Sequence, residues 1–196
     1  MTSLRHNRDP RDGYLDAARA CILDVGWRRT TLTEVARRAG VSRMTIYRTW
    51  PDMPTLLGDL MTREWAGVVE RVVAAEPRDA SPADRLVHAV VGTVRTLRDN
   101  ELFLRIVELD PELLLPYLLS RRGRSQDGIL ALLEEAVREG QADGDVRPGN
   151  PVALARTMVL AAHGFVLSAH TMVDDAVTED ELDAGLTDLL TRALAP

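Results

Sequence analysis

The sequence lacks lysine: all 24 basic residues are arginine, and Cys21 is the only cysteine. A single cysteine excludes an intramolecular disulfide and a thiolate-rich zinc site. Cys21 falls on the apolar side of an expected helix, which favours a small core residue over a redox sensor. The N-terminal stretch MTSLRHNRDPRDG has no apolar core of a signal peptide, so we expect a cytoplasmic protein.

Long apolar runs and enzyme motifs are also scarce. The longest uncharged run, 157–173, has seventeen residues and several polar interruptions, which favours a buried helix over a membrane span. The chain contains no H-E-x-x-H, no G-x-S-x-G and no dinucleotide-binding glycine fingerprint. Gly123 and Gly128 have Walker-like spacing, but Ile129 and Leu130 stand where lysine and serine or threonine belong. We therefore expect neither an enzyme nor a cofactor.

The charges of the chain are divided unevenly. Its 45% apolar and 28% charged residues are typical of a soluble globular protein, and its net charge is −6. Residues 1–50 hold ten arginines against five acids, a balance of +5, whereas the other 146 residues hold 14 against 25, a balance of −11. A basic segment on an acidic body attracts phosphates to one place and repels them elsewhere.

The stretch 30–50, TTLTEVARRAGVSRMTIYRTW, predicts two short helices joined by a tight turn. Thr31 and Glu34 have the spacing of a capping box at a helix start. Gly40 supplies the backbone freedom to end that helix and turn, and Ser42 can cap a second helix. This is the arrangement of a helix-turn-helix, whose second helix enters the major groove of DNA.

Val41 and Ile46 can pack the second helix against the first, so the rest of the second helix's surface faces outward. The projecting residues are Arg43, Met44, Thr45, Tyr47 and Arg48. The alternative is an ordinary helical hairpin whose arginines are merely solvated. The flanking helices and the basic N-terminal charge favour DNA binding.

The helices around this hairpin are also marked by the sequence. A first helix should run from Pro10 or Asp12 to Val25 and stop at Gly26, with Ala18, Cys21, Ile22 and Val25 inward. A proline at position 51 ends the second hairpin helix, and the next residue can cap a long helix of about 53–75. We expect a DNA-binding domain at 1–52 and a helical domain at 53–196, connected by that long helix.

The remainder of the chain reads as helices with no alternating strand pattern. The expected ranges are about 81–98, 101–107, 111–118, 125–139, 152–173 and 179–193. The fold class is therefore all-α, with about nine helices.

A first helix ending at glycine, the stretch 30–50, and a capped long helix containing Leu56 and Leu57 together resemble the tetracycline-repressor (TetR) family. The resemblance covers roughly residues 14–60. It implies a homodimeric transcriptional repressor that binds an inverted-repeat operator in double-stranded DNA. It also implies a C-terminal domain that dimerises through its last two long helices and encloses a pocket for a small-molecule effector, which releases the DNA.

The resemblance also assigns DNA-contacting positions. Arginine can pair with guanine, methionine and the threonine methyl can touch thymine's methyl group, and hydroxyls can hold phosphates. Carried over, phosphate contacts fall on Thr31, Thr33 and Tyr47, base contacts on Arg43, Met44 and Thr45, and either kind on Arg48.

Two departures from the family's pattern concern this surface. The family commonly has serine-lysine after the aromatic residue, with the lysine on phosphate, whereas residues 51–53 here are Pro-Asp-Met. Arg28, Arg29 or the arginines of the N-terminal tail can replace that contact. Met44 stands where glycine is common. The alternative function is therefore a helical ligand- or protein-binding dimer that has lost sequence-specific DNA recognition.

Candidates for an effector pocket are aromatic and histidine residues, although ordinary core positions explain them too. They are Trp65, His88, Phe103, Tyr117, His163 and Phe165. Such a lining predicts a largely apolar effector. His163 and His170 lie seven residues apart with no acidic or cysteine partner nearby, so no metal site is expected.

The last two helices carry many small residues, which permit the close approach needed in a four-helix dimer interface. The expected interface residues are Val159, Val166, Leu182, Leu186 and Leu189. The alternative is that these helices simply complete the core of a monomer.

Overall fold

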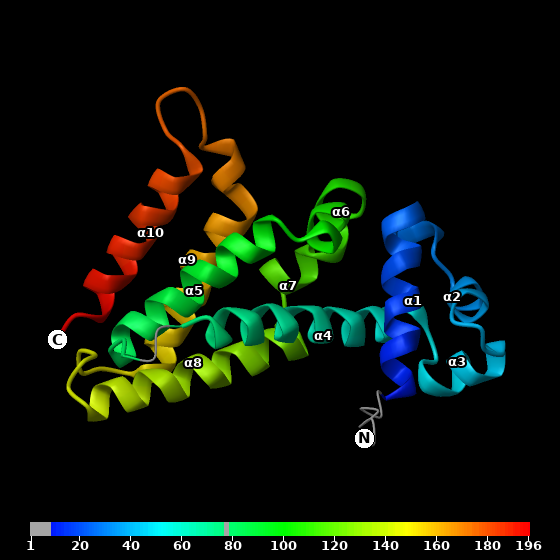
Figure 1. Ribbon diagram of the computed structural model, residues 1–196, viewed down its shortest axis with the longest axis horizontal. Helices are drawn as coiled ribbons and strands as arrows, with labels where there is room; N and C mark the ends of the chain where they lie inside the picture. The colour runs from blue at the N-terminus through cyan, green and yellow to red at the C-terminus, as the bar shows by residue number, and fades with distance from the viewer. Residues whose placement is uncertain (1–8, 77–78) are drawn as a thin grey trace, which may run out of the picture. The chain divides into compact units, whose positions relative to one another are not determined.

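The computed structural model describes residues 9–76 and 79–196, and this part of the chain contains helices and no strand (Figure 1). The described residues form two compact units. Unit 1 comprises residues up to Glu64 together with Glu101–Arg122, and unit 2 comprises Trp65–Asn100 together with Gly123–Pro196. The all-α prediction with an N-terminal helix-turn-helix is confirmed, with ten α-helices in the described residues in place of about nine.

Unit 1 contains the N-terminal helices and a later helical segment. Its elements are α1 (Pro10–Val25), the 3-10 turn η1 (Trp27–Arg29), α2 (Leu32–Arg38), α3 (Arg43–Thr49), the first half of α4 (Met53–Ala74), α6 (Glu101–Leu109), η2 (Pro111–Leu113) and α7 (Leu115–Leu119). The single helix expected at 111–118 is thus divided. Pro116, which has no N–H to donate, lies in the first turn of α7, where a proline is tolerated.

Helix α1 follows the sequence prediction closely. Asp9 caps it by accepting a hydrogen bond from the Arg11 N–H at 2.9 Å, and Gly26 ends it at a φ of 83°. Ala18, Cys21 and Ile22 are buried as expected. Val25 was expected to point inward, but it is exposed because the helix ends there and the chain turns away.

Trp50 anchors the end of α3 in the core of unit 1. Its side chain is fully buried, and its indole Nε1–H donates to Asp59 of α4 at 2.7 Å. Tyr14 of α1 meets its ring edge-on with centroids 6.3 Å apart, and the Arg11 guanidinium lies 5.4 Å from the ring centroid. These contacts tie α3 to both α1 and α4.

Unit 2 is a helical bundle with an apolar core. Its elements are the second half of α4, α5 (Pro82–Arg98), α8 (Arg124–Ala142), α9 (Pro151–Ser168), the 3-10 turn η3 (Ala169–Thr171) and α10 (Glu179–Leu194). The core gathers apolar residues from α5, α8, α9 and α10, including Val90, Val94, Leu133, Val137, Met158, Leu186 and Leu190.

The helix predicted at 152–173 extends too far. Helix α9 ends at Ser168, and the Thr171 hydroxyl donates to the Ser168 carbonyl at 2.7 Å beside the 3-10 turn. Such local side-chain bonds compete with continued helix. The stretch Pro151–Thr171 is long and apolar enough to cross a membrane by length and composition alone, with a mean hydropathy of 1.6. That is weak evidence for a span. Only 22% of the most apolar window is buried, so the expectation of a buried helix here is wrong.

Candidate nucleic-acid interface

Helix α2 begins at a threonine cap, as predicted. Thr31 is exposed, and its Oγ1 accepts a hydrogen bond from the Glu34 N–H at 3.2 Å. The reciprocal half of the expected capping box is absent, because the Glu34 carboxylate pairs with Arg37 at 2.6 Å. The hydrogen bond with Arg37 lowers the pKa of Glu34. Thr31 and Thr33 therefore stand exposed at the positive end of a short helix, where anions are favoured.

A tight turn separates α2 from α3. Gly40 has a φ of 67°, in the left-handed region that glycine adopts without steric cost. The Val41 N–H returns to the Ala36 carbonyl at 3.0 Å, closing the end of α2. Ser42 then caps α3 by accepting from the Thr45 N–H at 3.2 Å, and its hydroxyl lies 2.9 Å from that of Thr45.

One face of α3 is buried and the other is open. Ile46 is fully buried beneath the helix, as expected, whereas Met44 is 76% exposed. The Arg43 guanidinium lies over the Tyr47 ring, 5.8 Å from its centroid, and Tyr47 is itself exposed. The open face therefore combines an arginine, an aromatic hydroxyl and an apolar side chain, which are the groups that read base edges and hold phosphates.

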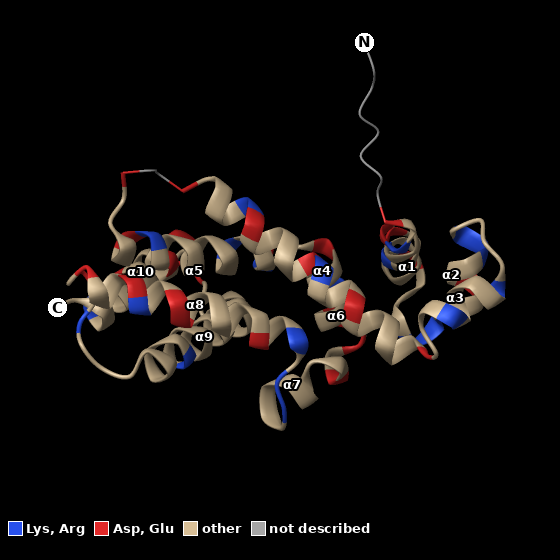
Figure 2. Cartoon of the chain, turned by 90° about the horizontal axis from the view of Figure 1, so that it is seen from below, with Lys and Arg blue, Asp and Glu red and all other residues tan. Residues whose placement is uncertain are grey.

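The arginines of unit 1 divide into paired and unpaired groups. Arg37 pairs with Glu34, and Arg38 pairs with Asp24 at 2.5 Å. In the part of the chain that the structure describes, no ion pair is formed by Arg29, Arg43 or Arg48. Figure 2 shows the basic residues of α2 and α3 in blue. Unpaired guanidiniums keep their full charge for an external anion.

Residues 51–53 have a structural role in place of a basic one. The Asp52 carboxylate accepts the Thr55 N–H at 2.8 Å and so caps α4. Hydrogen bonds with the side chain and the backbone of Thr55 lower the pKa of Asp52. Of the arginines considered as replacements for the missing lysine, Arg28 is held by Glu112 and Asp110. Arg29 is the better candidate of the two. The tail arginines Arg5 and Arg8 lie outside the described residues.

The predicted pocket residues are divided between the units. Trp65, His88, His163 and Phe165 belong to unit 2, whereas Phe103 and Tyr117 belong to unit 1. His88 lines a cavity of about 210 Å³ between α5 and α10, together with Asp84, Val87, Val91, Gly92, Arg95, Thr187 and Thr191. His163 is half-buried, and burial lowers its pKa. No cluster of three metal-ligating side chains occurs in residues 9–76 and 79–196.

A buried ionic cluster in unit 2 was missed from the sequence. Asp183 of α10 accepts hydrogen bonds from Arg95 Nε at 2.6 Å and from Arg98 Nη2 at 2.7 Å. The Arg98 side chain is only 10% exposed, and its Nε and Nη1 have no partner within the described residues. The signal was present: Asp183 precedes Leu186 and Leu190 on the inner stripe of α10, and Arg98 follows Val94 on that of α5.

The predicted interface residues have different surroundings. Leu186 is fully buried in the core of its own protomer, so it offers no surface to a partner. Val159, Val166 and Leu182 are half-buried, and Leu189 is 51% exposed. Leu160, which was not selected from the sequence, is 70% exposed on α9.

A capped helix-turn-helix with an open, basic recognition face defines a DNA-binding protein of the helix-turn-helix class. The family model for bacterial regulatory proteins of the tetR family matches residues 15–60. An HTH-type transcriptional regulator of Mycobacterium bovis is 34% identical over 194 residues, covering 97% of this chain and all of that protein. The chain belongs to the TetR family of bacterial transcriptional regulators.

Other relatives and solved structures agree. The HTH-type transcriptional regulator AqdR of Rhodococcus erythropolis is 44% identical over 161 residues, which cover 80% of this chain and 72% of AqdR. The structure of FadR from Bacillus subtilis, in complex with stearoyl-CoA, has a TM-score of 0.66 at 17% identity and covers 93% of this chain and 98% of FadR. The protein is thus a DNA-binding transcriptional regulator and not an enzyme, while the FadR likeness shows the fold alone.

Proposed function

We propose that the protein is a homodimeric repressor that a small, largely apolar effector releases from a palindromic operator. The observation that carries the proposal is the open face of α3, where Arg43, Met44 and Tyr47 are exposed and Arg43 has no acidic partner in the described chain. In this proposal the predicted DNA contacts keep their roles: Thr31 and Thr33 at the start of α2, and Arg43, Met44, Thr45, Tyr47 and Arg48 on α3.

Dimerisation is supported by apolar surface on the last two helices. Leu160 of α9 and Leu189 of α10 are both more than half exposed. Within Pro151–Thr171, only 22% of the most apolar 18-residue window is buried inside the single chain. Water-exposed apolar surface on this scale favours burial against a second copy, and a two-fold dimer matches an inverted repeat. Residues 1–52 would then bind DNA in the cytoplasm, and residues 53–196 would dimerise and bind the effector.

The effector proposal has two supports. Arg98 is a buried guanidinium with two unpartnered nitrogens, and buried donors without partners are costly. A carbonyl or carboxylate oxygen of the effector would supply an acceptor, while the apolar residues around the core of unit 2 suit an apolar body. FadR, which shares the fold, was solved with stearoyl-CoA, a molecule that combines an acyl chain with polar groups.

The test begins with selection of bound DNA from a random pool by the full-length protein. We expect a palindromic consensus, a dimer by light scattering, and release of the selected DNA by at least one member of a panel of acyl-chain compounds. Affinity must be measured at stated salt against competitor DNA, because phosphate contacts are strongly salt-dependent. An absence of any preferred sequence would favour the alternative suggested by residues 51–53, a ligand- or protein-binding dimer without an operator.

A further inference from the structure

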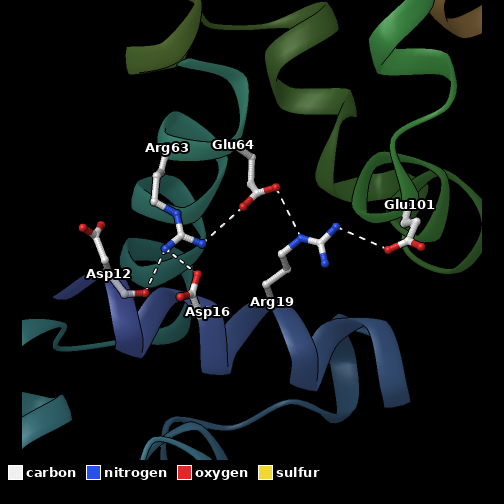
Figure 3. Close-up of polar contacts among 6 residues, drawn as sticks. All are labelled: Asp12, Asp16, Arg19, Arg63, Glu64 and Glu101. Carbon is white, nitrogen blue, oxygen red and sulfur yellow. Dashed lines mark hydrogen bonds and ion pairs between the residues drawn. The ribbon is translucent and has the colours of Figure 1, made fainter. Parts of the chain in front are cut away.

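Helix α6 is fixed to the DNA-binding helices at its first residue. Arg19 of α1 lies between two carboxylates, with its Nε 3.3 Å from Glu64 of α4 and its Nη2 3.4 Å from Glu101 of α6 (Figure 3). Arg63 of α4 pairs with Asp16 of α1 at 2.9 Å in the same network. All of these residues belong to unit 1, so α1, α4 and the start of α6 share one set of ion pairs.

The other end of α6 is fixed by a buried carboxylate. Asp110 directly follows α6 and is 2% exposed. Its Oδ2 accepts the backbone N–H of Trp27 at 2.9 Å, and its Oδ1 lies 3.4 Å from Arg28 Nε. A buried carboxylate that accepts a backbone N–H forms a strong, directional contact. This contact joins residues 83 positions apart in the sequence.

The turn that Asp110 contacts leads straight into the helix-turn-helix. The Thr30 N–H donates to the Trp27 carbonyl at 3.0 Å, and the buried Thr30 hydroxyl donates to the Gly26 carbonyl at 2.8 Å. The next residue, Thr31, is the cap of α2. A set of hydrogen bonds therefore runs from Asp110 through η1 to Thr30, the residue directly before the first one that we expect to contact phosphate.

The approach of α6 to this turn is close. Gly26 has a φ of 83°, and a Cβ added there would lie 3.2 Å from Leu109 Cδ1 and 3.6 Å from Asp110 Oδ2. Leu102 and Ile106 of α6 are fully buried in the same apolar cluster as Ile22 of α1. Helix α6 is consequently packed into the DNA-binding unit along its length and hydrogen-bonded to it at its end.

We propose that Asp110 is a positioning residue for operator binding: its carboxylate sets the α1–α2 turn, and with it the place of α2 and α3. Glu112, two residues later, pairs with the exposed Arg28 side chain and provides a matched control. The positioning role rests on the proposed operator binding and not on the proposed effector response.

The test uses the full-length protein and the operator selected from the random pool. Asp110→Ala should weaken operator binding at least tenfold and leave affinity for random DNA within twofold, because the arginine charges are unchanged. Asp110→Asn, which retains a side-chain oxygen to accept the Trp27 N–H, should stay within threefold. Glu112→Gln should stay within twofold. Hydrogen exchange of the Trp27 and Thr30 amides should accelerate in Asp110→Ala, with the amides of α8 and α9 unchanged.

Asp110→Glu keeps the charge but moves the acceptor oxygen by one methylene. This variant tests the positioning role if Asp110→Ala does not fold. Operator binding weakened at least fivefold in Asp110→Glu supports the positioning role. Binding equal to that of the unaltered protein, or equal losses on operator and random DNA, overturns it. If the pool yields no preferred sequence, the repressor proposal fails and the positioning role fails with it. A consensus bound normally by Asp110→Ala removes the positioning role alone.

Discussion

Arg43→Ala separates base reading from simple charge attraction. Arg43 is exposed on α3, its guanidinium lies 5.8 Å from the Tyr47 ring centroid, and no carboxylate in the described chain pairs with it. Truncation therefore leaves no buried group without a partner and opens no cavity. We expect the free energy of unfolding to change by no more than about 0.5 kcal/mol.

The expected loss of operator affinity follows from the contacts that an arginine makes on α3. A bidentate contact to guanine contributes about 1–3 kcal/mol of discrimination, equivalent to roughly 5- to 150-fold in affinity. The exposed contact with the Tyr47 ring holds the guanidinium over the open face. Losing the guanine contact should weaken the specific site by about 1–3 kcal/mol and relax the preference at one base position.

Gel shift at several salt concentrations, with the selected operator and with random DNA, measures this effect. Arg37→Ala is the matched control, because Arg37 is exposed, lies on α2 and is already paired with Glu34. It should alter both affinities by less than threefold. Equal losses on both DNAs in Arg43→Ala, with a salt slope reduced by about one, would show that Arg43 touches only phosphate and would refute the base-reading role.

Three further predictions concern the cap, the interface and pH. Thr31→Ala removes the cap of α2 and should lower stability to urea by about 1 kcal/mol; an unchanged midpoint would contradict the capping role. Leu189→Asp should give folded monomers by light scattering, whereas Leu186→Asp should unfold the protein because Leu186 is fully buried. Burial lowers the pKa of His163 below 6.5, so the unfolded chain binds protons more readily than the folded one as pH falls below 6.5. Stability should decline there, and His163→Gln should reduce that decline in thermal melts between pH 7.5 and 5.5.

Local signals in the sequence were sufficient for the helix-turn-helix. Ser42 caps α3 with its side chain, and Gly40 and the proline at position 51 act through their own backbones. All three act locally, so the limits of α2 and α3 followed from residue types and spacing. The second half of the capping box failed because Glu34 had an arginine within its own helix as an alternative partner.

Contacts between distant segments were not accessible in the same way. Asp110 reaches Trp27, and Asp183 reaches Arg98, across more than 80 residues. Helical periodicity indicates that such carboxylates face inward. It does not indicate which distant donor forms the hydrogen bond that offsets the cost of burying the charge. The same limit applies to Leu186, whose spacing suits both a dimer interface and the protomer core that it occupies.

The buried anchor at Trp50 has a consequence for how this regulator can change its target. Helix α3 has only seven residues, too few to form a stable helix alone. Its position depends on the buried side chains of Trp50 and Ile46 and on the Ser42 cap. The side chains that face outward contribute little to the packing that holds α3 in place. If Met44 and Arg48 contact DNA as proposed, their substitution should change the preferred operator at almost no cost in stability, so paralogues with new targets could arise by changing the open face alone.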